Sequence, residues 1–239
     1  MALLSVSHLS RSFGSLLAVN DVGFSLDEGV MLGIIGPNGA GKSTLFNLLT
    51  GMLPVSAGAI VFDGADITAA PSAARAAMGI ARTFQIPQPF ATLSVYENLL
   101  VAARHAGRMS HAQARDHCAA VLGRLGLRAL ADTPAGGLRL LDRKRLELAR
   151  ALAASPRLLL LDEIAGGLTD SECAELLAII RALRAGSVTI IWVEHVVHAL
   201  LSAIDRLIVM DAGRIIADGP PHDTFQRRDV REIYMGLDA

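Results

Sequence analysis

A glycine-rich stretch between an apolar strand and a helical run constrains this chain more than any other feature. Residues 36–44 read Gly-Pro-Asn-Gly-Ala-Gly-Lys-Ser-Thr and fit the pattern G-x-x-x-x-G-K-[ST]. The apolar run Val30–Ile35 precedes this stretch, and the helical run Leu45–Leu49 follows it. Glycines lack a Cβ, so the backbone can turn tightly and point its N–H groups inward at the positive end of a helix dipole. The sequence therefore predicts a phosphate-binding loop that opens a helix.

Each residue type in this loop has a predicted part in binding a nucleoside triphosphate. Lys42 is expected to reach the β- and γ-phosphates, and the Ser43 hydroxyl is expected to ligate Mg²⁺. The other predicted contacts come from Gly36, Asn38, Gly39, Ala40, Gly41 and Thr44. Phe13 follows the first expected strand and offers a ring on which adenine can stack, although a single phenylalanine is more often a core residue.

The groups that an ATPase needs besides a phosphate loop follow other expected strands. Four leucines end at Asp162, a predicted Mg²⁺ ligand, and Glu163, predicted to polarise the attacking water. Gln85 is predicted to ligate Mg²⁺ or to sense the γ-phosphate. His195 is predicted to donate to a γ-phosphate oxygen, the alternative being an exposed or helix-capping histidine. Strand carboxyl ends are where α/β sheets bind ligands, so these residues form one hypothesis with the loop.

A metal site is the less favoured interpretation of the residues around His195. Glu194 and His198 lie close to it in the sequence, but we find no matching ligand set elsewhere.

Composition limits the class of protein. The chain has 239 residues, 52% of them hydrophobic, which is enough for one large domain with a substantial core. A net charge of −1 gives no electrostatic reason to expect nucleic acid, and Cys118 and Cys173 do not make a disulfide framework. Mean hydropathy is high at +0.44, yet no uncharged apolar run approaches the roughly 20 residues of a spanning helix. A role at a membrane would therefore need another chain to hold this one there.

Periodicity and turn signals predict an α/β fold with a mostly parallel sheet, an N-terminal antiparallel β part and an inserted helical subdomain. Strands are expected at 3–9, 18–26, 30–35, 58–63, 80–84, 158–161, 188–193 and 207–210, and helices at 94–101, 110–125, 144–153 and 170–183. One domain, 1–239, would comprise a core at 1–86 and 154–220, a helical subdomain at 87–153 and a helical tail at 221–239.

Taken together, these residues resemble the ATP-binding subunits of ABC transporters. Gly36–Thr44, Gln85, Leu158–Glu163 and His195 occur in the order of that family's Walker A, Q-loop, Walker B with catalytic glutamate, and switch histidine. Three further segments resemble the branch that serves branched-chain amino-acid importers and their amide and urea relatives: Gly79–Gln85, Ser94–Leu99 and Val230–Gly236.

The resemblance carries expectations about fold, chemistry and assembly. It implies a P-loop NTPase fold of the ABC cassette type that binds and hydrolyses ATP with Mg²⁺. It also implies a dimer with a second ATP-binding subunit at the cytoplasmic face of the membrane, beneath two transmembrane permease subunits. A solute-binding protein would act indirectly, and no nucleic acid is expected as a partner.

One segment departs from the family pattern. The family carries L-S-x-G-Q before a helix that resembles Arg145–Leu152, and counting back places this signature segment at Leu138, Arg139, Leu140, Leu141 and Asp142. Leu141 at the glycine position would obstruct close approach of the backbone to phosphate, and Asp142 would add like-charge repulsion unless turned away. An intact phosphate loop with an altered signature segment predicts unequal ATP sites in a heterodimer.

Other interpretations stay open at this point. One alternative within the family is an ATPase of an export or lipid-extraction system, and another is a regulatory partner that binds ATP but hydrolyses it poorly. An alternative from another class is a soluble ABC ATPase that acts on DNA or ribosomes. The segment from Ile86 to Phe90 is expected either to dock a membrane subunit or to be a buried loop. The basic run Arg143–Arg145 is expected to be a solvated helix face.

Overall fold

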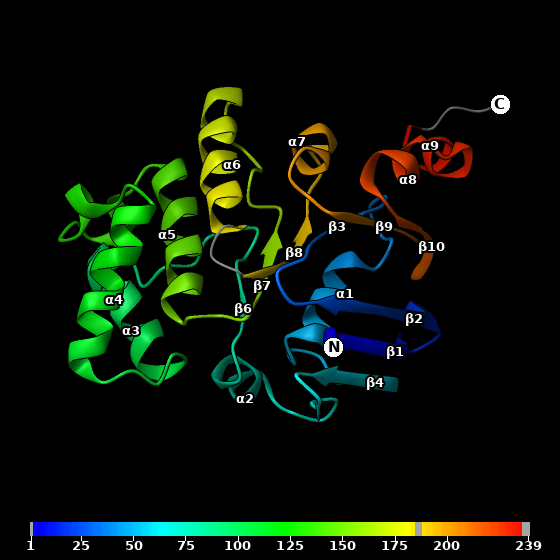
Figure 1. The fold of residues 1–239 in the computed structure, drawn as a ribbon, viewed down its shortest axis with the longest axis horizontal. Coiled ribbons are helices and arrows are strands. Elements are labelled where there is room, and N and C mark those ends of the chain that lie inside the picture. Colours follow the sequence, from blue (N-terminus) through cyan, green and yellow to red (C-terminus); the bar gives the residue numbers. More distant parts are fainter. Residues whose placement is uncertain (1, 185–187, 236–239) are drawn as a thin grey trace. The chain divides into compact units, whose positions relative to one another are not determined.

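The computed structural model describes residues 2–184 and 188–235 (Figure 1). The chain divides into two compact units. The first comprises residues 1–75 and 189–239, and the second comprises residues 76–188. None of the described helices combines the length and the apolar character needed to cross a bilayer.

The first unit opens with an antiparallel sheet, as expected. Strands β1 (Ala2–Phe13), β2 (Leu16–Asp27), β4 (Ala57–Phe62) and β5 (Ala65–Asp66) lie in the order β2-β1-β4-β5, and β1 lies between its two antiparallel partners. The β4–β5 hairpin turns at Asp63 and Gly64, which both have positive φ (51° and 76°). Two left-handed residues match the twist of the flanking strands, which is why this dipeptide can connect β4 to β5 in a tight hairpin.

The same unit contains buried parallel strands. Strand β3 (Met31–Ile35) pairs in parallel with β8 (Thr189–Val193) on one side and with β9 (Arg206–Asp211) on the other. Strand β10 (Arg214–Gly219) closes this edge by pairing antiparallel to β9. Every residue of β3 and β8 is buried, which explains why both read as continuous apolar runs rather than alternating ones.

Short helices complete the first unit. They are α1 (Lys42–Leu49), α7 (Val197–Leu201), α8 (Pro221–Gln226) and α9 (Arg228–Met235), and α2 (Ser72–Ala77) begins after Pro71 at the border with the second unit. Arg75 is 1% exposed and donates to the carbonyls of Leu48 and Leu49 at 2.6 and 2.9 Å. Both carbonyls belong to the last turn of α1, where the regular helical bonds run out, and the Leu48 carbonyl also accepts from the Gly51 N–H at 3.2 Å. Arg75 thus helps to fix the C-terminal end of the helix that follows the phosphate loop.

The described residues of the second unit form two parallel strands and four longer helices. Strand β6 (Ile80–Arg82) pairs with β7 (Leu158–Asp162), and between them in sequence lie α3 (Val95–His105), α4 (His111–Arg124) and α5 (Leu140–Ala153). Helix α6 (Asp170–Arg184) follows β7. Figure 1 shows α3, α4 and α5 packed side by side. Capping boxes at Ser94 and Ser110 start α3 and α4.

Helix boundaries differ from expectation at one functionally important place. Helix α5 begins at Leu140, four residues before the expected start at Lys144, with Arg139 as its N-cap residue. The segment 138–142 therefore does not precede the helix as a loop; three of its residues form the first turn. Leu140 and Leu141 are good helix formers, and tertiary packing extends the helix over a stretch for which the sequence offers no capping side chain. The borders of the expected helical subdomain at 87–153 stay a prediction.

Candidate functional site

The loop at residues 36–44 is built so that only glycine fits at two of its corners. Gly41 is the N-cap of α1 with φ at 99°, and a Cβ there would lie 2.4 Å from the Ala18 carbonyl oxygen. A Cβ on Gly36 would lie 2.1 Å from the Met210 carbonyl oxygen. Backbone from β2 and β9 thus crowds the loop from outside and leaves no space for larger residues. The loop is a backbone cradle of the kind that holds a phosphate.

Lys42 lies inside this cradle. It is the first residue of α1, only 6% exposed, and its Nζ donates to the carbonyl oxygens of Gly36 and Pro37 at 2.7 and 2.9 Å. Those acceptors are neutral, whereas hydrogen bonds from an ammonium to phosphate oxygens are charge-assisted and stronger. The buried ammonium is thus placed where an anion can compete for it.

The start of α1 favours an anion in other ways as well. Within the described residues, no side chain caps α1 at Gly41, and no acid lies in its first turn. Asn38, Gly39 and Ser43 are exposed at the mouth of the loop, while Ala40 is buried beneath it and Thr44 is half-buried. The first N–H groups of a helix have no helical acceptor, so the positive end of the α1 dipole is directed at the loop.

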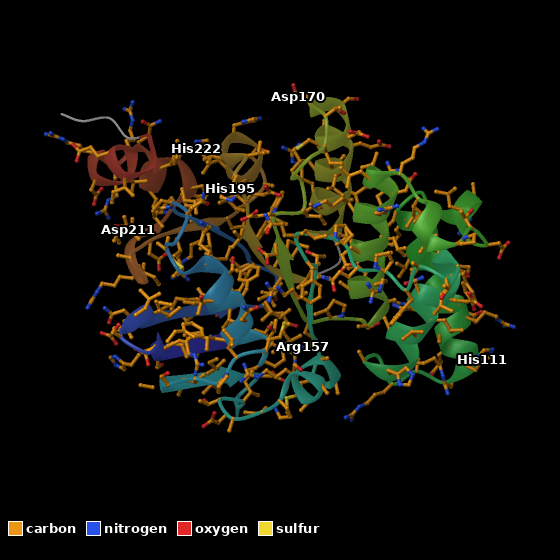
Figure 2. All side chains as sticks on the ribbon, turned by 180° about the vertical axis from the view of Figure 1, so that it is seen from behind. His111, Arg157, Asp170, His195, Asp211 and His222 are labelled. Atoms are coloured by element: carbon orange, nitrogen blue, oxygen red, sulfur yellow. The ribbon has the colours of Figure 1, made fainter. Side chains whose placement is uncertain are left out.

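His195 leaves the sheet beside the loop. In the β3–β8 register Ile34 lies opposite Val193, and Gly36 and His195 each follow two residues later. The phosphate loop and His195 (labelled in Figure 2) therefore extend from the same carboxyl edge of neighbouring parallel strands, where α/β sheets bind ligands. His195 is exposed, and its backbone N–H donates to the Glu194 carboxylate at 3.2 Å. Among residues 2–184 and 188–235, no three His, Cys, Asp or Glu side chains are grouped to hold a metal.

Phe13 is a surface residue and not a core residue. It ends β1 with 44% of its area exposed, and the Arg11 guanidinium lies 4.8 Å from the centre of its ring. The alternative of a core phenylalanine is therefore wrong. A role in stacking on adenine stays a prediction.

In the second unit, the predicted metal ligand Asp162 forms a buried ion pair. Its Oδ2 accepts from Arg82 Nη2 at 2.6 Å, and both side chains are 8% exposed. The Asp162 N–H donates to the Thr83 hydroxyl at 3.2 Å. Sequence reasoning missed Arg82 as a partner of Asp162. The parallel pairing of β6 with β7, which puts Arg82 opposite Leu160, brings the two side chains together.

Glu163 and Gln85 are also brought together in the second unit. The Gln85 Nε2 donates to Glu163 Oε2, and the buried Lys144 donates to the Gln85 carbonyl at 2.7 Å. Glu163 has φ at 46°, a conformation that costs a residue with a side chain about 1–2 kcal/mol. Such strain clusters at functional sites, where the surroundings hold it in place. The expectation that the basic run around Lys144 is solvated is wrong at this residue, which is 2% exposed.

The signature segment lies at the exposed start of α5. Arg139 is exposed, Leu140 is 43% exposed and Leu138 is buried. Asp142 lies in the first turn, 3.5 Å from Arg145, where both the helix dipole and the cation stabilise its charge. The repulsion expected from Asp142 is thereby partly compensated within its own helix.

The donors present fit a magnesium nucleotide. Glycine corners that exclude a Cβ match a backbone approach to phosphate, and Lys42 supplies a cation. In the first unit, the Ser43 hydroxyl at the mouth of the loop is an oxygen donor for Mg²⁺. In the second unit, the Gln85 amide oxygen and the Asp162 carboxylate are, each by itself, oxygen ligands of the type that Mg²⁺ prefers.

Comparison with known proteins agrees with this chemistry. The family model described as ABC transporter matches residues 19–166. The chain is 38% identical to the high-affinity branched-chain amino acid transport ATP-binding protein BraF of Pseudomonas aeruginosa, with 98% of both chains covered. It is 37% identical to LivG of Escherichia coli K12, which carries the same description, again over 98% of both chains. It is 33% identical to the lipopolysaccharide export system ATP-binding protein LptB of Escherichia coli K12, with 100% of this chain and 99% of that protein covered.

Solved structures show the same fold. A nucleotide-free ATP-binding cassette from an ABC transporter is 32% identical, with a TM-score of 0.90 over 99% of this chain and 100% of that one. The ADP conformation of the cassette MJ1267 gives the same values. The expected cassette fold is thereby confirmed.

The crowding around Gly41 predicts a specific effect of adding one methyl group. Gly41→Ala should destabilise the chain by about 3 kcal/mol in denaturant unfolding and abolish ATP binding, because its Cβ meets backbone and the left-handed φ is strained. Gly64→Ala is the matched control: its φ is 76° but nothing lies within 4 Å of the added Cβ, so it should cost only about 1 kcal/mol. Equal stability of the two variants, with normal ATP affinity for Gly41→Ala, would contradict the cradle geometry.

Proposed function

The chain belongs to the ABC transporter family, and on that premise we propose that it energises an importer of branched-chain amino acids or of a related small amide or amino-acid solute. It is an ABC ATPase subunit homologous to the ATP-binding proteins of branched-chain amino-acid importers. The observation that supports the solute class best is the 38% identity to BraF over 98% of both chains. By itself the fold would support many ABC functions.

The proposed reaction is hydrolysis of ATP by water. The loop at residues 36–44 holds the triphosphate through its N–H groups and Lys42. Glu163 orients the attacking water and acts as the general base that accepts its proton. Gln85 senses the γ-phosphate, and His195 donates a hydrogen bond to a γ-phosphate oxygen. Mg²⁺, with ligands from Ser43, Gln85 and Asp162, would neutralise the negative charge of the phosphates.

We propose that the ATP sites are unequal and that the partner is a different ATP-binding subunit. In the family's dimer each nucleotide lies between one chain's phosphate loop and the other chain's signature segment. This chain has an intact loop, but Leu141 stands where the family has glycine. The site made of this chain's phosphate loop and the partner's ordinary signature segment would be competent. The site made of the partner's phosphate loop and this chain's altered signature segment would hydrolyse ATP poorly.

The unequal-site proposal predicts different results from the same change in the two subunits. Glu163→Gln should lower ATP turnover of the reconstituted complex at least about 100-fold, because the water loses its base, while ATP binding stays. The equivalent change in the partner should leave more than about half of the turnover. Single-turnover and steady-state hydrolysis on the two complexes check this. Equal losses from both changes would reject unequal sites.

The segment from Ile86 to Phe90 supports a membrane-subunit partner. Ile86 is 73% exposed and Phe90 is 47% exposed, so the alternative of a buried loop is wrong for these residues. Pro87 and Pro89 stiffen the same stretch. Apolar side chains held at a surface are a docking feature, and we propose that one of the two permease subunits docks here and holds the chain at the cytoplasmic face of the membrane. A solute-binding protein would deliver solute to those permeases.

Docking through this segment predicts an uncoupled variant. Phe90→Asp should lower solute uptake by proteoliposomes at least about tenfold, because a carboxylate in an apolar contact costs more than 1.4 kcal/mol. ATP hydrolysis by the detergent-solubilised complex should stay within about twofold. Leu17→Asp, at another exposed apolar residue (42%), is a control that should leave uptake intact. Normal uptake by Phe90→Asp would remove this segment from the docking surface.

A second candidate is an export or lipid-extraction system, favoured by the 33% identity to LptB over the whole chain. Identifying the permease that co-purifies, and the solute that stimulates hydrolysis, distinguishes the two candidates. Stimulation by a lipopolysaccharide and not by an amino acid would favour export.

A further inference from the structure

Helix α5 carries a stripe of charged residues that is turned away from water. Lys144 and Glu147 are 2% and 4% exposed, and the Arg150 side chain is 23% exposed. Residues three apart on a helix are neighbours on one side of it, so the three form a continuous row. Charged side chains are seldom buried unless partners compensate them, so the partners of this row define its role.

The partners belong largely to the backbone of segment 84–88, which follows β6. Lys144 Nζ donates to the Gln85 carbonyl at 2.7 Å, and Arg150 Nη1 donates to the Gln88 carbonyl at 2.9 Å. The Glu147 carboxylate accepts from the backbone N–H groups of Phe84 and Gln88, and from Arg150 at 3.0 Å. The row therefore binds both donors and acceptors of this segment at several points.

These same contacts oppose the effect of burial on Glu147. Burial is the larger influence and raises the pKa of its carboxyl group, and the charge of Arg150 with the hydrogen bonds from Arg150, Phe84 and Gln88 offsets part of this rise. A well-packed apolar residue would avoid the burial cost. Retaining a carboxylate here gives the segment a fixed acceptor for two backbone N–H groups that lie outside any strand.

The contacts continue from the backbone to the exposed end of the segment. The Arg150 guanidinium lies 5.2 Å from the centre of the Phe90 ring. The fully buried Asn98 of α3 accepts from the Phe90 N–H at 2.9 Å and donates to the Phe90 carbonyl at 3.1 Å. The Phe90 backbone is thus fixed, its ring lies against Arg150, and the residue as a whole stays 47% exposed.

We propose that Lys144, Glu147 and Arg150 are positioning residues, together a clamp, that make α5 and segment 84–90 move as one piece. The clamp rests on the proposed function, because its purpose is to transmit movement of the start of α5 to a docked permease. Helix α5 begins within the signature segment, and segment 84–90 ends at Phe90. Movement at one end is therefore passed to the other without loss in a flexible loop.

The test compares a released clamp with two matched variants in the complex reconstituted with its partner subunits. Glu147→Gln combined with Arg150→Met removes two opposite charges together, so no buried charge is left unpaired. Arg150→Lys keeps a positive charge beside Glu147 and should therefore retain the coupling of ATP hydrolysis to transport. Arg143→Met changes an exposed basic residue of the same helix, outside the clamp. Thermal unfolding confirms that every variant is folded.

Two readouts decide the outcome. Hydrogen exchange in peptides covering residues 84–90 should rise at least about tenfold in the released clamp, and the solute moved per ATP hydrolysed should fall at least about fivefold. Arg150→Lys and Arg143→Met should stay within about twofold of wild type in both. Unchanged exchange in the released clamp would overturn the proposal, and so would faster exchange with an unchanged transport ratio.

These results are distinguishable from failure of the docking proposal. If Phe90→Asp transports normally, docking at this segment is wrong whatever the clamp does. If Phe90→Asp is uncoupled while the released clamp keeps its exchange or its transport ratio, docking stands and the clamp is wrong. If the folded double variant cannot be obtained, Lys144→Met serves as the released form, with Lys144→Arg as its rescue.

Discussion

The nucleotide site depends on a backbone shape that side chains cannot supply. Gly36 and Gly41 stand where neighbouring carbonyl oxygens leave no room for a Cβ, and this lets the loop turn directly into α1. The turn directs the N–H groups and the positive end of the helix towards one point, and Lys42 lies buried at that point. Recognition of phosphate by backbone requires only that the loop be held rigidly, and Arg75 and the flanking strands provide that support.

In the second unit, charged side chains with little solvent exposure are held by ion pairs and hydrogen bonds. Asp162 is paired with Arg82, and Glu163 receives a hydrogen bond from Gln85 while its backbone holds a strained φ. Lys144 reaches the carbonyl groups of both Gln85 and Glu163. The hydrogen bonds hold Glu163 in its strained backbone conformation, and that conformation places its carboxylate and carbonyl groups where the hydrogen bonds form. The Glu163 and Gln85 side chains are therefore held in a defined arrangement, which is what the proposed electrostatic catalysis requires.

The sequence predicted those parts of the molecule whose signal is local. The phosphate loop and the buried strands each occupy a few consecutive residues with a definite physical requirement. The start of α5 was misplaced because no capping side chain marks Arg139. The partners of Lys144 could not be predicted, because they are carbonyl groups far away in the sequence, which no residue type announces. A basic run with acids nearby looks the same whether it faces water or a buried backbone.

Calorimetric titration of the folded chain with Mg·ATP tests the central claim most directly, alongside Lys42→Ala under the same conditions. The account predicts one bound nucleotide per chain and a loss of affinity of at least about tenfold, or 1.4 kcal/mol, when the buried ammonium is removed. Far-ultraviolet circular dichroism establishes that both proteins are folded. Absence of binding by the folded wild-type chain, or the same affinity in Lys42→Ala, would contradict the account.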